Sequence, residues 1–300
     1  MKHFFFRGDP PNFGDEINAT MWKHLLPEGM LDDDESTLFL GIGSIIQHGY
    51  DPKARKVVVG SGYGGYTKKP DVHDGTWDFR FVRGPQTAED MGLSPDLAIV
   101  DAAVLLRSTP LPAPAEGIDV AFMPHYESLE RGNWKRVCEI AGVHFLDPSA
   151  PHEQTIAEIR GANLVITEAM HGAIVSDAMR TPWIGVRTMH HVHRYKWNDW
   201  ARSLDIDYQP VTLWPSNGRE AWAFTTGRWG SGPKARMLLE GPIAAPANFG
   251  LLHSSARSMK RIARGRPSLS SDAAIERATE RALAAVNRFV RDYADQSVPA

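Results

Sequence analysis

The stretch from Ala162 to Arg187 constrains the fold of this chain more than any other. It starts with a short apolar run, Leu164 to Ile166, passes through a polar turn into small residues, and ends in a second apolar run, Trp183 to Val186. This order is typical of a buried strand, a helix and another buried strand, the repeating unit of parallel sheets. The chain is therefore expected to be an α/β protein.

Polar residues mark the point where the first of these strands ends and the helix begins. They are Thr167, Glu168 and His171. Ligands bind at this edge of open α/β sheets, because helix N-termini there present free N–H groups to anions. Gly172 permits a close approach, and Pro182 ends the helix. His171 is thus the strongest candidate for chemistry; the alternative is a core histidine that bonds a neighbouring strand.

Short apolar runs recur along most of the chain, separated by turns and helical patterns. The first half predicts strands at 3–6, 37–40, 57–59, 79–82 and 97–100, with helices at 16–25 and 85–91. The second half predicts strands at 120–123, 143–146, 164–166 and 183–186, with helices at 134–141, 152–160, 173–180 and 193–204. Alternation of this kind predicts doubly wound parallel sheets.

A proline-rich run, 108–117, separates the two halves and is typical of a stiff linker. The pattern on its two sides predicts two Rossmann-like domains facing across a cleft, an arrangement called GT-B. The expected division is an N-terminal domain at 1–110, a C-terminal domain at 111–215 that carries Glu168 and His171, and an extension at 216–300.

The extension contains two recognisable segments. Residues 251–266 carry five basic side chains and no acidic one, which fits either a solvated surface or a patch that meets an anionic membrane. The last segment predicts an amphipathic helix that Ser271 caps. Its apolar side chains recur at helical spacing, at Ile275, Ala278, Ala282, Val286, Phe289 and Tyr293.

Composition limits the classes of function. The 300 residues are 42% hydrophobic and 23% charged with a net charge of −3, a balance that argues against a nucleic-acid binder. One cysteine, Cys138, excludes an internal disulfide and is expected in a buried helix. The N-terminal apolar run, Phe4 to Phe6, is shorter than the roughly seven residues of a signal peptide or the about 20 of a membrane span. We therefore expect a cytoplasmic protein.

Two glycine-rich loops follow predicted strands. Residues 60–65 match Gly-x-Gly-x-x-Gly, but a dinucleotide site also needs a helix there and an acidic residue about 20 positions later, where the chain has Val82-Arg-Gly-Pro. A loop that lines the cleft is the favoured interpretation, together with its companion at 41–44. Gly43, Ser44 and Gly62 are the candidate binding residues.

The histidines at 190, 191 and 193 raise the question of a metal site. Three imidazoles with no carboxylate nearby make a weak metal site, because metal ligands normally have supporting partners. Arg187 and Arg194 flank them, so the neighbourhood favours a phosphate or carboxylate ligand. No metal is predicted.

The segment Asn12-Phe-Gly-Asp-Glu16 opens the first predicted helix. Asp15 fits two roles there. It is either the N-cap of the helix, or else Asp15 or Glu16 faces the cleft and orients or deprotonates a hydroxyl.

These motifs together resemble the polysaccharide pyruvyl transferase family, and most of all the ketal pyruvyltransferases of bacterial exopolysaccharide synthesis, the succinoglycan type. The resemblance spans about residues 3 to 200. It rests on 12–16, the two glycine loops, 82–85, and Val165-Ile-Thr-Glu-Ala-Met-His-Gly172 with Arg180-Thr-Pro182.

The resemblance implies a GT-B-like fold and an enzyme that transfers pyruvate from phosphoenolpyruvate to a hexose as a ketal, with no cofactor. Its acceptor would be a lipid-linked glycan, which allows peripheral contact with the cytoplasmic face of the inner membrane. His171 is the expected general acid, and Glu168 or Asp15 the base. The expected substrate-binding residues are Asn12, Gly43, Ser44, Gly62, Arg83, His125, Arg187 and Arg194.

One position departs from the family pattern. Family members usually have an arginine two residues before the histidine, where this chain has Ala169. Arg83, Arg187 and Arg194 are the expected substitutes. Two other functions stay open: a GT-B glycosyltransferase that uses a nucleotide sugar, and a glycan- or anion-binding protein without turnover.

Overall fold

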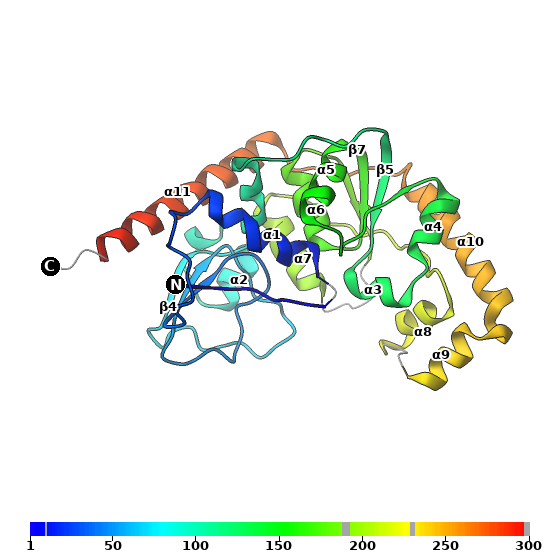
Figure 1. Cartoon of the computed structure of the whole chain (residues 1–300), viewed down its shortest axis with the longest axis horizontal. Helices are drawn as coiled ribbons and strands as arrows, with labels where there is room; N and C mark the ends of the chain where they lie inside the picture. Colours follow the sequence, from blue (N-terminus) through cyan, green and yellow to red (C-terminus); the bar gives the residue numbers. More distant parts are fainter. Residues whose placement is uncertain (10, 188–192, 229–231, 297–300) are drawn as a thin grey trace. The chain divides into compact units, whose positions relative to one another are not determined.

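A computed structural model describes residues 1–9, 11–187, 193–228 and 232–296 (Figure 1). The chain forms two compact units. Unit 1 consists of Met1–Leu111, Val192–Tyr208 and Ser270–Ala300, and unit 2 of Pro112–His191 and Gln209–Leu269. The first boundary falls in the proline-rich run, but the units interleave instead of following one another as 1–110, 111–215 and 216–300.

Unit 1 is built on a parallel sheet with the strand order β1-β2-β3-β4. Its strands are β1 (Lys2–Phe4), β2 (Thr37–Leu40), β3 (Arg55–Val59) and β4 (Trp77–Phe81). Its α-helices are α1 (Phe13–Met21), α2 (Pro85–Asp90), α7 (Arg194–Ser203) and α11 (Asp272–Gln296). Its 3₁₀ segments with described bounds are η1 (Trp22–His24), η2 (Pro95–Leu97) and η3 (Ala102–Ser108).

The strand expected at 97–100 is wrong. Pro95 begins the 3₁₀ turn η2, which Ser94 caps by accepting a hydrogen bond from Asp96 N. Only an isolated bridge joins Val82 to Ala98. Ile99 and Val100 are nevertheless buried, so their apolar character reflects irregular core backbone rather than a strand.

Unit 2 is built on a second parallel sheet, with the strand order β6-β5-β7-β8. Its strands are β5 (Ile118–Met123), β6 (His144–Phe145), β7 (Ala162–Thr167) and β8 (Trp183–Gly185). Its helices are α3 (Tyr126–Arg131), α4 (Trp134–Ala141), α5 (His152–Gly161), α6 (Met170–Ala178), α8 (Gly218–Thr226), α9 (Pro233–Glu240), η5 (Pro242–Ala244) and α10 (Ala245–Ile262). The β7-α6-β8 segment and the two parallel sheets confirm the α/β class.

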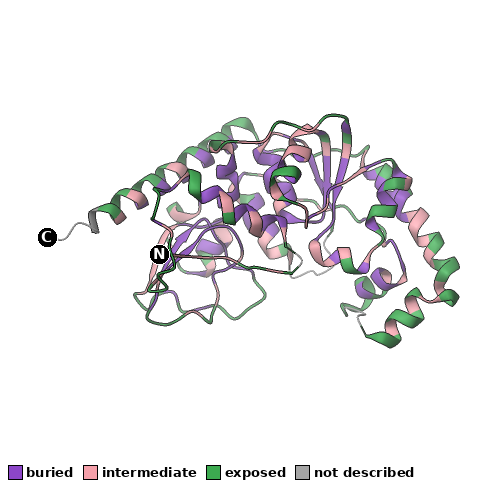
Figure 2. Cartoon of the chain, in the orientation of Figure 1, coloured by how far each residue is buried: buried purple, intermediate pink, exposed green. Residues whose placement is uncertain are grey.

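The core of unit 2 joins its sheet to α4 and α10. Val137 and Cys138 of α4 pack with Met259 and Ile262 of α10, and Phe122 comes from β5. Figure 2 shows the buried faces of these two helices. The expected burial of Cys138 in a helix is confirmed.

The C-terminal amphipathic helix is also confirmed. Ser271 Oγ accepts a hydrogen bond from Ala274 N at 3.1 Å, which caps α11. Ile275, Ala282 and Phe289 are buried, and α11 packs on η3 and β4 of unit 1. Among the helices of the described residues, none is long and apolar enough to cross a membrane.

Candidate active site

Three predicted site residues lie at one edge of the unit 2 sheet. The strands β5, β7 and β8 run parallel, with Met123 paired to Thr167 and Thr167 to Gly185, so their carboxyl ends meet at this edge. His125 follows β5, Glu168 follows β7, and Arg187 follows β8 after Val186. The order of the elements thus brings together residues that are far apart in sequence, as the edge rule for α/β sheets predicts.

The Glu168 side chain is buried and held by backbone. Its Oε2 accepts a hydrogen bond from His125 N at 3.0 Å, and Glu168 N donates to Met123 O at 2.9 Å. Only 6% of Glu168 is exposed. These bonds continue the β5–β7 pairing beyond the strands and fix the carboxyl at the sheet edge.

The turn after Glu168 leads directly into α6. Thr167 Oγ1 accepts from Ala169 N at 3.0 Å and donates to Ala169 O at 2.8 Å. His171 lies in the first turn of α6 and is partly buried. A side chain at Gly172 would clash with Thr167 Oγ1 and lie 2.9 Å from Met123 Sδ. Glycine therefore lets α6 begin against the ends of β5 and β7.

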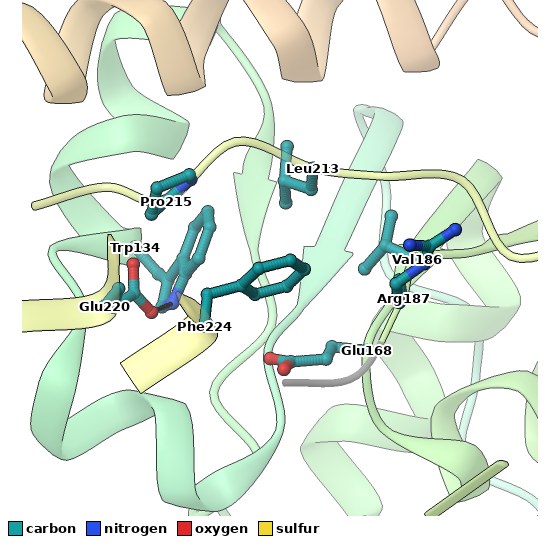
Figure 3. Close-up of a pocket in the computed structure, with 8 residues that line it drawn as sticks. All are labelled: Trp134, Glu168, Val186, Arg187, Leu213, Pro215, Glu220 and Phe224. Atoms are coloured by element: carbon teal, nitrogen blue, oxygen red, sulfur yellow. Dashed lines mark hydrogen bonds between the residues drawn. The ribbon is translucent and has the colours of Figure 1, made fainter. Parts of the chain in front are cut away.

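A pocket opens at this edge of unit 2 (Figure 3). It is lined by Trp134, Glu168, Val186, Arg187, Leu213, Pro215, Glu220 and Phe224. Glu220 and Arg187 lie on opposite sides of it, and the Phe224 ring reaches across it from α8. His171 is not among the described residues that line it. The pocket combines two carboxyls, one guanidinium and an apolar wall.

Sequence reasoning missed Glu220, which is fully buried in this pocket. Burial raises its pKa from 4.5 to about 7, and the Glu168 charge adds to the rise, while hydrogen bonds from Ser216 and Trp134 oppose it. Trp134 Nε1 donates to Oε1 at 2.8 Å, and Ser216 N and Oγ donate to Oε2 at 2.8 and 2.5 Å. A carboxyl in this state can hold or release a proton near neutral pH.

The sequence contains a signal for the start of α8 but none for the burial of the Glu220 carboxyl. Asn217 Oδ1 accepts from Glu220 N at 2.9 Å, an N-cap of α8 that the pattern Asn-x-x-Glu suggests. Nothing in that pattern indicates that Glu220 lies against Trp134, which is 86 residues away.

Unit 1 brings together a second set of predicted residues. The two glycine loops touch, because Gly62 N donates to Gly43 O at 3.0 Å. Arg83 Nη1 donates to Ser44 Oγ at 2.7 Å. No helix follows the loop at 60–65, as the argument against a dinucleotide site expects.

The Arg83 guanidinium is engaged by the protein itself. It is fully buried, and it donates from Nε to Asp199 Oδ2 at 3.0 Å and from Nη2 to Tyr63 O at 2.5 Å. Asp199 also accepts from the backbone N–H groups of Gln86 and Thr87, at the start of α2. Arg83 therefore supports the glycine loops; its contact with a donor anion stays a prediction.

Asn12 and Asp15 lie together at the start of α1. Asn12 Nδ2 donates to Asp15 Oδ2 at 2.7 Å, and α1 begins at Phe13 with Asn12 as its N-cap residue. Asp15 is thus inside the first turn, and the N-cap interpretation of this residue is wrong. Burial raises its pKa to about 6, opposed by the Asn12 hydrogen bond and the Lys196 charge.

The last of the predicted binding residues, Arg194, belongs to α7. Arg194 is exposed at the first position of α7, and His193 precedes it. His190 and His191 lie outside the described residues. Within the part of the chain that the structure describes, no three His, Cys, Asp or Glu residues are grouped so as to hold a metal ion.

Comparisons with known proteins agree on one family. A model of the family described as polysaccharide pyruvyl transferase matches residues 43–191, which include Glu168, His171 and Arg187. The chain is 34% identical to the succinoglycan biosynthesis protein ExoV of Rhizobium meliloti (strain 1021), over 98% of this chain and 100% of that protein. No solved structure matches the chain. This chain therefore belongs to the polysaccharide pyruvyl transferase family and is a polysaccharide pyruvyltransferase.

Proposed function

We propose that this chain transfers the pyruvyl group of phosphoenolpyruvate to two hydroxyls of an exopolysaccharide hexose, forming a ketal and releasing phosphate. The observation that carries the proposal is the pocket at the edge of the unit 2 sheet, which Glu168 and Arg187 both line. Arginine suits the phosphate and carboxylate of such a donor. A fixed carboxylate suits the deprotonation of a sugar hydroxyl.

The reaction needs one proton donor and one base. Protonation of the enol carbon C3 leaves an oxocarbenium-like C2, which the first sugar hydroxyl attacks as its proton passes to the base. The C2–O bond to phosphate then breaks, phosphate leaves with that electron pair, and the second hydroxyl attacks C2. One hydroxyl proton replaces the proton given to C3, and the other leaves with phosphate, so the transfer needs no redox partner.

The residues of unit 2 are proposed to divide these tasks. Glu168 takes the hydroxyl proton, because His125 N and the end of β7 hold its carboxyl at the pocket. Arg187, which lines the same pocket, binds the donor's negative charge. His171 lies in the first turn of α6, three residues after Glu168, and is not among the described residues that line the pocket. It is nevertheless the proposed donor of the proton to C3, because its imidazole is suited to acid catalysis near neutral pH. Asp15 remains the alternative base, supported by its raised pKa of about 6.

The wider setting belongs to the same proposal. We propose a GT-B-like arrangement, a lipid-linked glycan acceptor, a cytoplasmic location and no requirement for a cofactor. The two parallel sheets support the GT-B-like fold, and the family membership supports a glycan acceptor.

The test follows labelled donor into product. Phosphoenolpyruvate carrying ¹³C at C3 is incubated with the protein and with glycan extracted from host cells that lack it. We expect a ¹³C methyl signal attached to glycan and an equal amount of phosphate. Glu168→Gln and His171→Ala should lower the rate by about 10²–10⁴-fold, the usual contribution of a general acid or base. The exposed residues Glu116 and His24 provide matched controls, as Glu116→Gln and His24→Ala.

Other outcomes would contradict the proposal. Label that stays in phosphoenolpyruvate, while sugar from UDP-glucose enters the glycan, would identify a glycosyltransferase. Glycan that is retained by the protein without any transfer would identify a binding protein. An equal loss of transfer rate in Glu116→Gln and Glu168→Gln would show that Glu168 is not the base.

A further inference from the structure

The most exposed large apolar side chains of the described residues lie close together in sequence. Met237, Leu238, Ile243 and Phe249 are 71%, 71%, 98% and 65% exposed, above every other large apolar side chain that the structure describes. They belong to α9, η5 and the start of α10, all in unit 2. Figure 2 shows this part of the chain as mainly exposed. We call these four residues the apolar tip.

The backbone that carries the apolar tip is fixed to unit 2 by polar contacts. Asn248 donates from Nδ2 to Leu239 O at 2.8 Å, and its Oδ1 accepts from Gly218 N at 2.7 Å. Arg219 is nearly fully buried and lies 3.4 Å from Glu240 at the end of α9. The apolar side chains are therefore displayed by an ordered scaffold, and their exposure needs an explanation of its own.

Basic side chains continue from the apolar tip along α10. Phe249, His253, Arg257 and Lys260 follow one helical stripe of α10, at spacings of three and four residues. Arg264 follows in the turn after the helix. The opposite side of α10, with Ser255, Met259 and Ile262, is buried against unit 2, where α10 packs on α4 (Figure 1). The exposed side of this helix thus has an aromatic ring at its start and cations toward its end.

These cations lie in a segment of the sequence that contains no acidic residue. Between Glu240 and Asp272 the sequence has no Asp or Glu, while Arg257, Lys260, Arg261, Arg264 and Arg266 are exposed. Among the described residues, none of these five forms an ion pair. Surfaces that combine exposed apolar side chains with uncompensated cations fit an interface of hydrocarbon and negative charge.

We propose that the apolar tip and the cations Arg257 and Lys260 of α10 dock this protein on a bilayer that contains anionic phospholipids. Met237, Leu238, Ile243 and Phe249 enter the boundary between headgroups and acyl chains. Arg257 and Lys260 meet the phosphates of the lipids, and each such cation strengthens binding to a negative surface. A soluble acidic polymer matches the cations but leaves the apolar tip exposed, so a membrane is the partner that accounts for both.

The test is flotation of the whole chain with lipid vesicles, which needs no donor or acceptor. Wild type should float with vesicles of phosphatidylcholine and phosphatidylglycerol in equal parts and stay behind with phosphatidylcholine alone. The double variant Ile243→Asp/Phe249→Asp should weaken binding at least about tenfold, because two large apolar side chains lose their burial. Arg257→Glu/Lys260→Glu should also weaken it, and added salt should do so in wild type.

Matched controls come from unit 1. Phe6 is 55% exposed and Arg288 is exposed on α11, so Phe6→Asp/Arg288→Glu changes the same residue types elsewhere. This control should float as wild type does, and all variants should keep the wild-type melting temperature, since the changed side chains are exposed.

Four results would overturn the proposal. The first is failure of wild type to float with anionic vesicles. The second is equal loss of flotation in the unit 1 control. The third is binding to soluble dextran sulfate without binding to vesicles, which would make the cations a polyanion site. The fourth is a dimer in solution that Ile243→Asp dissociates while vesicles are not bound, since a second copy would then cover the tip.

Discussion

At the scale of single residues, burial changes what a carboxyl group can do. Glu168 and Glu220 line the same pocket, and each is hydrogen-bonded to donors from distant parts of unit 2. Removing water from Glu220 disfavours its charge and raises its pKa to about 7. Protonation of Glu220 also removes one of the two negative charges that the carboxyls of this pocket can carry.

This raised pKa predicts a pH dependence of stability. The unfolded Glu220 ionises near its ordinary pKa of 4.5, and the folded one near 7, so the folded state binds more protons between these values. Stability contributed by the protonated carboxyl is present below about pH 4.5 and is lost as pH rises toward 7. The loss is of the order of 3 kcal/mol, at about 1.4 kcal/mol per unit.

Urea unfolding at pH 5 and pH 7.5 measures this effect. Glu220→Gln cannot ionise, so its free energy of unfolding should fall less between the two pH values than that of wild type. The exposed Glu116→Gln should follow wild type. If Glu220→Gln and wild type change in parallel, Glu220 is not the group that titrates.

The sequence predicted some of these residues and not others. Glu168, His125 and Arg187 could be placed at one sheet edge because parallel strands carry the residues that follow them to the same side. Glu220 could not be placed there, since its contact with Trp134 depends on how α8 returns to the sheet. An acidic residue in a helical pattern reads as solvent-exposed until its neighbours are known.

At the scale of elements, the contact between α6 and the sheet depends on Gly172. A Cβ added at this position would clash with Thr167 Oγ1 and Met123 Sδ, which are buried at the ends of β7 and β5. Gly172→Ala should therefore destabilise the protein by about 1–3 kcal/mol, despite the better helix propensity of alanine.

Gly250 is the matched control, because it lies within α10 and has no atom within 4 Å of its added Cβ. Gly250→Ala should stabilise the protein by about 0.5–1 kcal/mol. Thermal unfolding of the two variants gives the comparison. Equal and small effects in both would show that α6 can shift to accept a methyl group.

Most elements were predictable because their patterns are local. The strands at 37–40 and 183–185 and the helix at 134–141 combine apolar periodicity with clear breakers. Residues 97–100 were wrongly predicted as a strand, because the side chains of a buried irregular segment are as apolar as those of a buried strand. Helix α1 begins at Phe13, three residues before its predicted start at Glu16, because Asn12 and not Asp15 is the N-cap residue.

At the scale of the whole molecule, distant segments of the chain complete unit 1. Val192–Tyr208 and Ser270–Ala300 join Met1–Leu111, so the chain leaves this unit and returns to it. An amphipathic helix shows in its sequence that it has an apolar face, but not which core that face will cover. The sequence therefore could not predict that these three segments, far apart along the chain, belong to one unit.

Asp199 of α7 connects the 192–208 segment to Arg83 and to the start of α2. It accepts hydrogen bonds from Arg83, from Gln86 N and from Thr87 N, so it pairs a buried cation and caps α2. Asp199→Ala leaves Arg83 buried without this partner and should cost about 3–5 kcal/mol. Amide hydrogen exchange should also become faster in α2.

Asp33, which is exposed in the same unit, supplies the control, and Asp33→Ala should leave stability within about 0.5 kcal/mol of wild type. A change of less than about 1 kcal/mol in Asp199→Ala would mean that the other contacts of Arg83 hold the 192–208 segment in place without it.

The central claim is that the donor is phosphoenolpyruvate and that the unit 2 pocket binds it. The most direct measurement is calorimetric titration of the purified protein with phosphoenolpyruvate and, separately, with UDP-glucose, repeated on Arg187→Ala and on the exposed Arg288→Ala as control. We predict saturable phosphoenolpyruvate binding that weakens by about tenfold or more in Arg187→Ala and not in Arg288→Ala. Binding of UDP-glucose without binding of phosphoenolpyruvate would contradict the account.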